Sequence, residues 1–250
     1  MPEPIRKAIV VGASSGIGAA IAKRLAALGA TVAVVARRED ELQGLCEEIN
    51  KSAGEERAIP FPHDVRNREE IPLLFQDIAR RLDGLDAIFY AAGVMPDVEP
   101  NEFSTDKDAL MMEVNTIGAM AWLNEGAKRF ERMGSGRLIG ISSIAGDRGR
   151  RGNPAYCTSK AALNTFLESL RNRLEVKGVS VTTIKPGFVD TVMTQGKPGL
   201  IWLISPEKAA ERIVEAARQN KNIVYVPGQW RLVGTVIQSI PSFLFKRINI

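Results

Sequence analysis

The residues whose types and spacing could do chemistry are Tyr156 and Lys160, four positions apart, with Ser143 upstream of them. Residues four apart share one face of a helix, so the Lys160 ammonium and the Tyr156 phenol can point into one pocket. A free phenol titrates at about 10, and a fixed cation nearby favours the phenolate and moves its pKa toward neutral pH. Ser143 could then hold a substrate oxygen. The spacing predicts a proton-transfer site, although a Tyr packed on a Lys stem would leave the same pattern.

A glycine-rich turn near the start of the chain provides a second candidate site. An apolar run at residues 5–11 leads into the heptapeptide GASSGIG at residues 12–18, and helical spacing of Ile and Leu follows to residue 28. A second β-rich run then covers residues 31–35. Strand, glycine turn, helix and strand in this order form the unit whose backbone amides and helix N-terminus bind a pyrophosphate. The turn therefore predicts a dinucleotide site.

The same turn also spells the G-x-S-x-G pattern of α/β-hydrolases, with Ser14 as the nucleophile. That chemistry needs a histidine late in the chain, whereas the only histidine, His63, follows the third predicted strand. The hydrolase hypothesis therefore carries little weight, and it predicts that His63→Ala is inactive.

Strand and helix patterns alternate along the chain, which is the arrangement of a parallel sheet. We therefore predict an α/β fold with a doubly wound parallel sheet of Rossmann type, about seven strands, and helices on both faces. The length of 250 residues, 45% hydrophobic and 25% charged, suits a single catalytic domain at residues 1–250. The predicted strands are residues 5–11, 31–35, 58–61, 85–90, 137–141, 179–184 and 223–226, and the predicted helices are residues 17–28, 40–50, 69–82, 106–132, 156–176 and 206–219.

Charge and cysteine content narrow the functional classes. The 33 Lys and Arg against 29 Asp and Glu give a net charge of +4, too small to predict nucleic-acid binding. Cys46 and Cys157 lie far apart without a C-x-x-C motif or a nearby histidine pair, so we expect neither a disulfide nor a metal site. The sequence opens without the features of a signal peptide, and no uncharged run reaches the ~18 residues of a membrane span. These features predict a cytoplasmic protein.

Residues 227–250 form a hydrophobic C-terminal extension beyond the last predicted strand. Its large apolar side chains must be covered, and we expect them to pack over the active-site mouth or at a subunit interface. Shallow docking on a membrane surface, helped by Arg231, Lys246 and Arg247, is the second and less favoured interpretation.

Three arginines lie between Ser143 and Tyr156, and they are Arg148, Arg150 and Arg151. They could recognise an anionic substrate such as a carrier-linked acyl group, because guanidinium groups bind such anions well. A solvated loop is the favoured interpretation, since surface arginines are common.

Seven motifs, in order, resemble those of the short-chain dehydrogenase/reductase family. They are GASSGIG at 12–18, HDV at 63–65, AAG at 91–93, Asn115, ISSIAG at 141–146, YCTSK at 156–160 and PGFVDT at 186–191. Each motif is modestly specific, but together they cover residues 5–226. The resemblance implies an oxidoreductase that moves hydride between a nicotinamide and a carbonyl or secondary alcohol.

The resemblance also implies a role for each residue of the proton-transfer site. Tyr156 would be the general acid/base, and Ser143 would orient the substrate oxygen, with Ser142 as the alternative serine. Lys160 would bind the nicotinamide ribose and lower the pKa of the phenol, while Asn115 would hold a water in a proton relay. A regulator that binds the dinucleotide without turnover is the remaining alternative, and this set argues against it because binding alone does not need these residues.

The cofactor site and the assembly follow from the same resemblance. Relatives form dimers or tetramers through the helices that correspond to those near Asp106 and Tyr156, so a homodimer or homotetramer is expected. Residues 199–204 sit where relatives have a substrate lid, and their apolar character suggests an apolar part of the substrate, unless they simply pack on the core. The residues expected at the cofactor are Gly12, Ser14, Ser15, Gly16, Ile17, Gly18, Arg37, Arg38, Asp64, Val65, Ala91, Ala92, Gly93, Tyr156, Lys160, Pro186, Gly187, Val189 and Thr191.

The end of the second predicted strand bears on which nicotinamide is used. An NAD enzyme places an acidic residue about 20 residues after the glycine turn, where it binds the ribose hydroxyls. Here that place is taken by Ala36 or Arg37, and the first acid, Glu39, begins the next helix. Arg37, Arg38 and the Ser14 hydroxyl could bind a 2′-phosphate, so we predict NADP(H). The alternative is that Glu39 binds the ribose.

One motif departs from the family pattern. Relatives usually carry Asn-Asn-Ala-Gly after the fourth strand, and this chain has Tyr90-Ala91-Ala92-Gly93. The loss of two amide side chains puts the bracing of the fourth strand in question. Backbone contacts to a cofactor need no particular side chain, so we expect activity to be retained.

Overall fold

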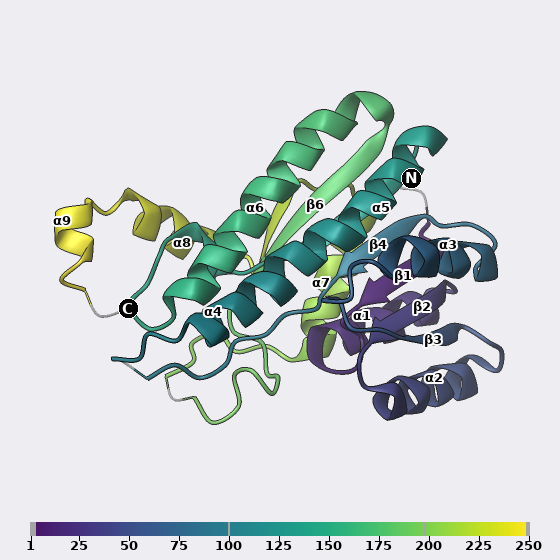
Figure 1. The fold of residues 1–250 in the computed structure, drawn as a ribbon, viewed down its shortest axis with the longest axis horizontal. Helices are drawn as coiled ribbons and strands as arrows, with labels where there is room; N and C mark the ends of the chain where they lie inside the picture. The colour runs from purple at the N-terminus through teal and green to yellow at the C-terminus, as the bar shows by residue number, and fades with distance from the viewer. Residues whose placement is uncertain (1–3, 100, 198, 249–250) are drawn as a thin grey trace.

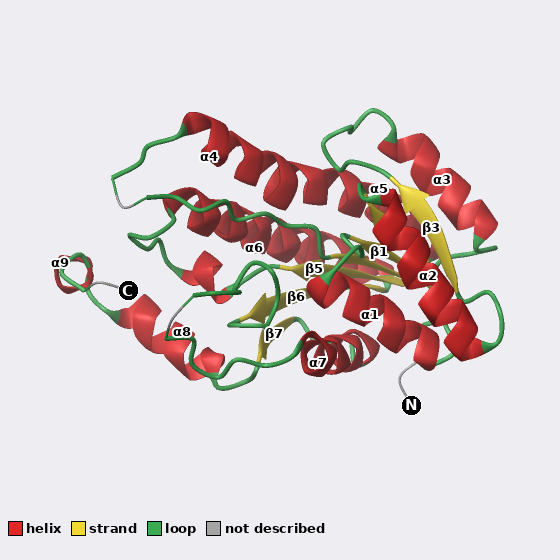
Figure 2. Ribbon diagram, turned by 90° about the horizontal axis from the view of Figure 1, so that it is seen from below, coloured by secondary structure: helices red, strands yellow, loops and turns green. Residues whose placement is uncertain are grey.

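The computed structural model describes residues 4–99, 101–197 and 199–248, and one seven-stranded parallel sheet forms its centre. The strand order is β3-β2-β1-β4-β5-β6-β7, with helices on both faces (Figures 1 and 2). The predicted doubly wound fold is therefore confirmed. The strands are β1 (Lys7–Val11), β2 (Thr31–Ala36), β3 (Ala58–Pro62), β4 (Ala87–Tyr90), β5 (Gly136–Ile141), β6 (Val179–Pro186) and β7 (Ile223–Val226).

The helices follow the predicted alternation with two differences. The helix predicted at residues 106–132 is divided by a short π-helix, η1 (Glu113–Ile117), and the C-terminal extension folds into two helices for which no prediction was made. The α-helices are α1 (Gly16–Ala27), α2 (Glu39–Ala53), α3 (Ile71–Arg81), α4 (Thr105–Met112), α5 (Gly118–Met133), α6 (Pro154–Leu174), α7 (Pro206–Arg218), α8 (Trp230–Ser239) and α9 (Ser242–Phe245), and two 3-10 turns are η2 (Ile144–Asp147) and η3 (Glu175–Lys177).

Two apolar cores lie on opposite faces of the sheet, because successive side chains of a strand point to opposite sides. Val10 of β1 belongs to the core that contains Ile21 of α1 and Ile213 of α7. Its neighbour Ile9 belongs to the other core, which contains Trp122 of α5. The central strands are covered by helices on both faces, and this is why they read as continuous apolar runs in the sequence.

The chain reverses its direction across the sheet at β1, which pairs with β2 on one side and β4 on the other. In a doubly wound sheet, a crevice opens at such a point beyond the carboxyl ends of the strands. The glycine turn follows β1 there. The loops after β4, β5 and β6 leave the same edge, so the motifs that are far apart in the sequence meet at one place.

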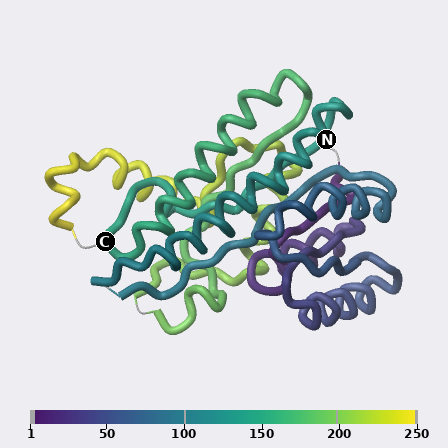
Figure 3. The backbone as a smooth tube through the Cα atoms, in the orientation of Figure 1, coloured from purple at the N-terminus to yellow at the C-terminus, as the bar shows by residue number. Residues whose placement is uncertain are grey.

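The C-terminal helices extend away from the sheet. In Figure 3 the yellow segment, α8 and α9, projects from the end of the molecule opposite to α2 and α3. Within the described ranges, the molecule has no helix of the length and apolarity that crossing a bilayer requires.

Candidate active site

A pocket of about 730 Å³ lies at the crevice. Every residue predicted for catalysis or cofactor binding lines it, except Asn115. Its wall also contains apolar residues that the motifs did not indicate, five of them in loops and two in the helices α4 and η1. They are Val94, Met95, Pro96, Leu110, Val114, Val192 and Met193.

The glycine turn is shaped by close backbone contacts. Gly12 has a φ of +87°, and a Cβ there would lie 2.3 Å from the amide nitrogen of Ala92. A Cβ on Gly18 would lie 2.1 Å from the carbonyl oxygen of Gly12. Side chains are therefore excluded at both positions. The turn ends at Gly16, where α1 begins. No side chain caps this helix, so the first backbone amides of α1 remain available to an anion.

The start of α6 sets the positions of the proton-transfer residues. Asn153 caps the helix, and its Oδ1 accepts a hydrogen bond from the amide of Tyr156 at 3.0 Å. Pro154 occupies the first turn, where its missing N–H costs nothing. Tyr156 and Lys160 consequently lie on the first two turns, and the Lys160 ammonium is 5.8 Å from the centroid of the Tyr156 ring.

The pKa values of this pair differ from the sequence expectation. Burial raises the pKa of Tyr156 to about 12, against the opposing effect of a hydrogen bond with Ser143. Burial also lowers the pKa of Lys160 to about 8, and the Lys160 ammonium donates to the carbonyl of Ile141 at 3.0 Å. The expected downward shift of the Tyr156 pKa is therefore reversed in this structure, because the effect of burial outweighs that of the hydrogen bond with Ser143.

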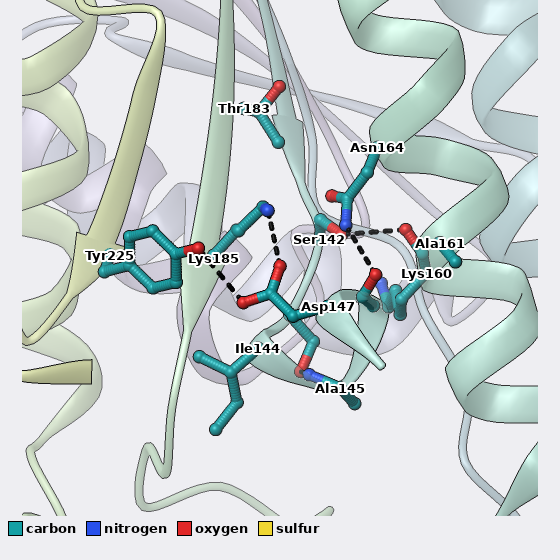
Figure 4. Close-up of polar contacts among 12 residues, drawn as sticks. Ser142, Ile144, Ala145, Asp147, Lys160, Ala161, Asn164, Thr183, Lys185 and Tyr225 are labelled. Atoms are coloured by element: carbon teal, nitrogen blue, oxygen red, sulfur yellow. Dashed lines mark hydrogen bonds and ion pairs between the residues drawn. The ribbon is translucent and has the colours of Figure 1, made fainter. Parts of the chain in front are cut away.

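The two neighbouring serines have different partners. Ser142 Oγ donates to the carbonyl of Lys160 at 3.2 Å, which fastens the end of β5 to α6 (Figure 4). Ser143 caps η2 instead, and its Oγ accepts a hydrogen bond from the amide of Ala145 at 3.1 Å. An oxygen that accepts this bond still has a proton to donate. The proton of the Ser143 hydroxyl therefore remains available, whereas that of Ser142 is already donated to the Lys160 carbonyl.

Asn115 lies behind the pocket wall, in the π-helix η1, and is fully buried. Its Oδ1 accepts from the amide of Val94 at 2.7 Å, and its Nδ2 donates to the Val94 carbonyl at 3.0 Å and to Ser159 Oγ at 3.0 Å. The side chain thus joins the loop after β4 to α6. Short π-helices of this kind occur often at functional sites.

Tyr90 provides the bracing that the departure from the family pattern put in question. Its hydroxyl donates to the carbonyl of Val114 at 2.6 Å, one residue before Asn115, and its ring is fully buried. Gly118 makes room for it, since a Cβ there would lie 2.8 Å from the hydroxyl oxygen. Burial raises the pKa of Tyr90, so this hydroxyl stays a donor.

Two arginines stand at the end of β2 beside the glycine turn. Arg38 Nη2 donates to Ser14 Oγ at 2.9 Å and to Ser15 Oγ at 3.0 Å. Arg37 lies 3.9 Å from a carboxylate oxygen of Asp64. Hydrogen bonding from Arg66 is the main reason why the pKa of Asp64 is lowered. The side chains of Arg37 and Arg38 both line the pocket, and Arg38 is hydrogen-bonded to the Ser14 hydroxyl of the glycine turn.

The alternative hydrolase site does not assemble. Ser14 Oγ is bonded to Arg38, and His63 Nε2 lies 3.2 Å from the carbonyl of Asn67. The imidazole also packs edge-on against Trp122, 5.6 Å between ring centroids. His63 lines the pocket, but its ring belongs to the core beneath the loop after β3.

The C-terminal extension does not cover the pocket that the structure describes, since none of residues 227–248 lines it. Trp230 instead packs behind the wall: a Cβ on Gly187 would lie 2.0 Å from its indole nitrogen. Residues 199–204 do not line the pocket either, and Trp202 packs edge-on against Trp230 with 5.3 Å between ring centroids. In the segment before residues 199–204, Val192 and Met193 are apolar residues that line the pocket.

Arg148 does not line the pocket, and its guanidinium contacts the C-terminal helices instead of lying free in solvent. Its Nη1 donates to the carbonyl of Ile237 at 2.6 Å and to that of Ile240, and its guanidinium lies 3.9 Å from the centroid of the Phe245 ring. These carbonyls end α8, where a cation is stabilising. Arg148 therefore fixes the C-terminal helices to the loop after β5.

Comparison with known proteins agrees with this arrangement. The short chain dehydrogenase family model matches residues 6–198. An uncharacterized oxidoreductase of Staphylococcus aureus (strain N315) is 32% identical over 217 residues, which cover 86% of this chain and 92% of the relative. An uncharacterized oxidoreductase of Mycobacterium tuberculosis is 27% identical over 244 residues, 97% of this chain and 96% of the relative.

Solved structures share the fold. A short-chain type dehydrogenase/reductase from Mycobacterium marinum matches with a TM-score of 0.81 and 23% identity, over 88% of this chain and 93% of that one. The 3-oxoacyl-[acyl-carrier protein] reductase from Brucella melitensis matches with a TM-score of 0.79 and 23% identity, over 88% of this chain and 89% of that one. At these identities the likeness concerns the fold alone.

Proposed function

Because this chain belongs to the short-chain dehydrogenase family, we propose that it is an NADP(H)-dependent oxidoreductase acting on a carbonyl or secondary alcohol. The observation that carries the proposal is the meeting of Ser143, Tyr156 and Lys160 with the glycine turn in one pocket. Proton transfer and dinucleotide binding would then occur within the same 730 Å³. A binding module alone would need only the glycine turn.

The turn fits a dinucleotide on its own geometry. Gly12 and Gly18 leave no room for side chains, and the uncapped start of α1 offers amides to a pyrophosphate. Bound there, a nicotinamide supplies or accepts the hydride. Lys160 would hold the ribose from the floor of the pocket, and Gly93 lies beside it, since a Cβ on Gly93 would be 3.5 Å from the Lys160 ammonium.

Tyr156 would give its proton to the substrate oxygen during reduction. A phenol whose pKa burial raises to about 12 keeps its proton at neutral pH, so the group is an acid in this environment. The Ser143 hydroxyl would hold the same oxygen while the proton moves. Asn115 would be a positioning residue, because its side chain holds Val94 and Ser159 in place by hydrogen bonds.

Arg37 and Arg38 support NADP(H) over NAD(H). Both are cationic, both line the pocket, and Arg38 is held at the hydroxyls of Ser14 and Ser15. A 2′-phosphate on the ribose would meet these guanidinium groups, which bind phosphate through parallel hydrogen bonds. Ala36, the last residue of β2, has no carboxylate of its own to repel such a phosphate.

The pocket wall points to a substrate with an apolar part. Val94, Met95, Pro96, Val192 and Met193 line the side away from the glycine turn, and apolar walls with a few polar groups are typical of small-molecule sites. A cytoplasmic homodimer or homotetramer is part of the same proposal and follows from the family.

The test is to follow nucleotide absorbance with a panel of ketones, aldehydes, keto sugars and carrier-linked keto esters. We expect turnover of at least one apolar carbonyl with NADPH. Tyr156→Phe serves as the matched control, since it keeps the ring and removes the transferable proton. Turnover by Tyr156→Phe at the parent rate would overturn the assignment of the proton donor.

A further inference from the structure

Exposed apolar side chains are concentrated at one end of the molecule. Among the described residues, fifteen large hydrophobic side chains are exposed, and eight of them lie in residues 201–203 and 232–248. Such a concentration marks an interaction surface rather than scattered surface residues. We call this set the end patch. Its members are Ile201, Trp202, Leu203, Leu232, Val236, Phe243, Leu244 and Ile248.

The two segments of the end patch adjoin each other. The rings of Trp202 and Trp230 are 5.3 Å apart between centroids, and Phe188 packs on the same indole at 5.4 Å. Trp230 begins α8, so the loop at residues 201–203 meets the first turn of the helix. The remaining members continue along α8 and α9, which project from the body (Figures 1 and 2).

The helix that carries the patch is already packed on its inner side. Trp230, Gly234 and Ile237 of α8 are buried against the domain, whereas Leu232 and Val236 are 75% and 62% exposed on the outside. Residues four apart lie on one helical face, so these two side chains form one stripe. These two side chains are not packed against the domain, so they are free to contact a partner.

Charge selects the kind of partner. Residues 227–250 contain Arg231, Lys246 and Arg247 and no Asp or Glu. All three cations are exposed beside the patch. A two-fold contact between copies would bring two cationic surfaces without acidic residues together, since such an interface uses the same surface twice. An anionic bilayer offers an apolar interior for the hydrophobic side chains and negative headgroups for the three cations.

We propose that the end patch docks this protein on an anionic lipid bilayer. Leu232, Val236 and Phe243 enter the boundary between headgroups and acyl chains, and the cations stay at the lipid phosphates. The helices lie on the surface and do not cross it. This inference does not depend on the proposed function, because the patch lies outside the pocket wall.

The experiment uses the full chain and sucrose-loaded vesicles that are sedimented. One set contains phosphatidylcholine alone, and the other contains about one third phosphatidylglycerol. We expect the protein to sediment with the anionic vesicles, with at least about tenfold weaker binding to neutral vesicles or at high salt. No substrate is involved, so failure here and failure of the proposed function are distinguishable.

We choose point variants and not a deletion of the C-terminal helices, because α8 packs on the domain and its removal could disturb the fold. Phe243→Ser with Leu244→Ser removes apolar depth, and Lys246→Glu with Arg247→Glu reverses charge, at exposed positions that leave the fold intact. The matched control is Leu73→Ser on α3, which is 74% exposed at the other end. We expect both double variants to lose at least about tenfold in vesicle binding and the control to bind as the parent does.

Two results would overturn the proposal. The parent protein could stay in the supernatant with anionic vesicles at low salt, or the double variants could bind as tightly as the parent. Light scattering without lipid tests whether a second copy of the chain, and not a bilayer, covers the end patch. If the double variants lowered the oligomeric mass and the parent did not bind vesicles, the patch would be an interface between copies.

Discussion

The ammonium of Lys185 lies 2.5 Å from the carboxylate of Asp147, and both side chains are almost completely buried. The hydroxyl of Tyr225 donates to the second oxygen of the same carboxylate at 3.0 Å (Figure 4). Asp147 ends the turn η2 that Ser143 begins, and Lys185 immediately precedes Pro186 in β6. The ion pair therefore joins the segment with the proposed catalytic serine to the segment proposed for the nicotinamide side.

The C-terminal helix α8 closes over this pair. A Cβ on Gly234 would lie 2.8 Å from Asp147 Oδ2 and 3.2 Å from the Tyr225 ring, so only glycine allows the helix to come so near. Burial and the charge of Asp147 raise the pKa of Tyr225 to about 12, which keeps its hydroxyl a donor. The extension thus has a structural role at the domain in addition to its exposed face.

Lys185→Met should destabilise the protein strongly. It leaves the Asp147 carboxylate buried without a cation, and loss of one partner of a buried pair costs about 3–5 kcal/mol. The measurement is urea unfolding monitored by circular dichroism. The control is Lys23→Met, which breaks an exposed pair with Glu48 and should cost less than about 1 kcal/mol. Asp147→Asn combined with Lys185→Met removes both charges and should recover most of the loss. Equal effects of Lys185→Met and Lys23→Met would contradict this.

Tyr156→Phe should bind NADPH nearly as the parent does and reduce its carbonyl substrate at least about 10²-fold more slowly, because it lacks the transferable proton. Stopped-flow turnover and fluorescence titration separate the two properties. Ser159→Ala serves as the control for disturbance of α6, since Ser159 Oγ binds Asn115 and the Tyr156 carbonyl but does not line the pocket. Weakened NADPH binding in Tyr156→Phe to the same degree as turnover would indicate a role in binding instead.

The contacts that the sequence could not predict share a physical feature. Asp147 and Lys185 are 38 positions apart and belong to no periodic pattern, so only the packed sheet brings them together. The hydrogen bond from Tyr90 to Val114 is equally non-local. The upward pKa shift of Tyr156 depends on burial, which spacing does not reveal.

Local patterns, by contrast, were sufficient for most of the fold. Runs of apolar residues predicted the seven strands, and the helix predicted at residues 156–176 is observed as α6, which begins two residues earlier at Pro154. The π-helix around Asn115 was missed, because the sequence analysis treated residues 106–132 as one continuous helix. The helices of the extension were also missed, since their apolar residues face solvent as well as the domain.

NADPH should bind more weakly as the pH rises above about 8. Burial lowers the pKa of Lys160 to about 8, so the ammonium proposed to hold the cofactor loses its proton from that pH upward. The Kd should stay level between about pH 7 and 8 and then rise by up to about tenfold per pH unit. Tyr156, with a pKa of about 12, does not titrate in this window. The measurement is fluorescence titration at each pH.

Two variants separate Lys160 from other groups in that experiment. Lys160→Met should bind NADPH weakly at every pH and show no inflection at 8, because the titrating amine is gone. Tyr156→Phe should keep the inflection. An identical pH dependence in the parent and in Lys160→Met would assign the titration to another group.

Arg38→Ala should discriminate between the two nicotinamide cofactors. Arg38 Nη2 is held at Ser14 Oγ and Ser15 Oγ, 2.9 and 3.0 Å away, and we propose that it binds the 2′-phosphate of a dinucleotide on the glycine turn. Hydrogen bonds to a charged group contribute about 1.5–3 kcal/mol, so the Kd for NADPH should rise about tenfold to a hundredfold while that for NADH changes little. The difference should shrink at high salt, since part of it is the attraction between the guanidinium and the phosphate. Arg81→Ala is the matched control, because it removes the same charge far from the pocket. Arg81 pairs with Glu56 on the outside of α3. Tighter binding of NADH than of NADPH by the parent protein would reverse the assignment, and an equal loss for both cofactors in Arg38→Ala would mean that the guanidinium supports the turn and not the phosphate.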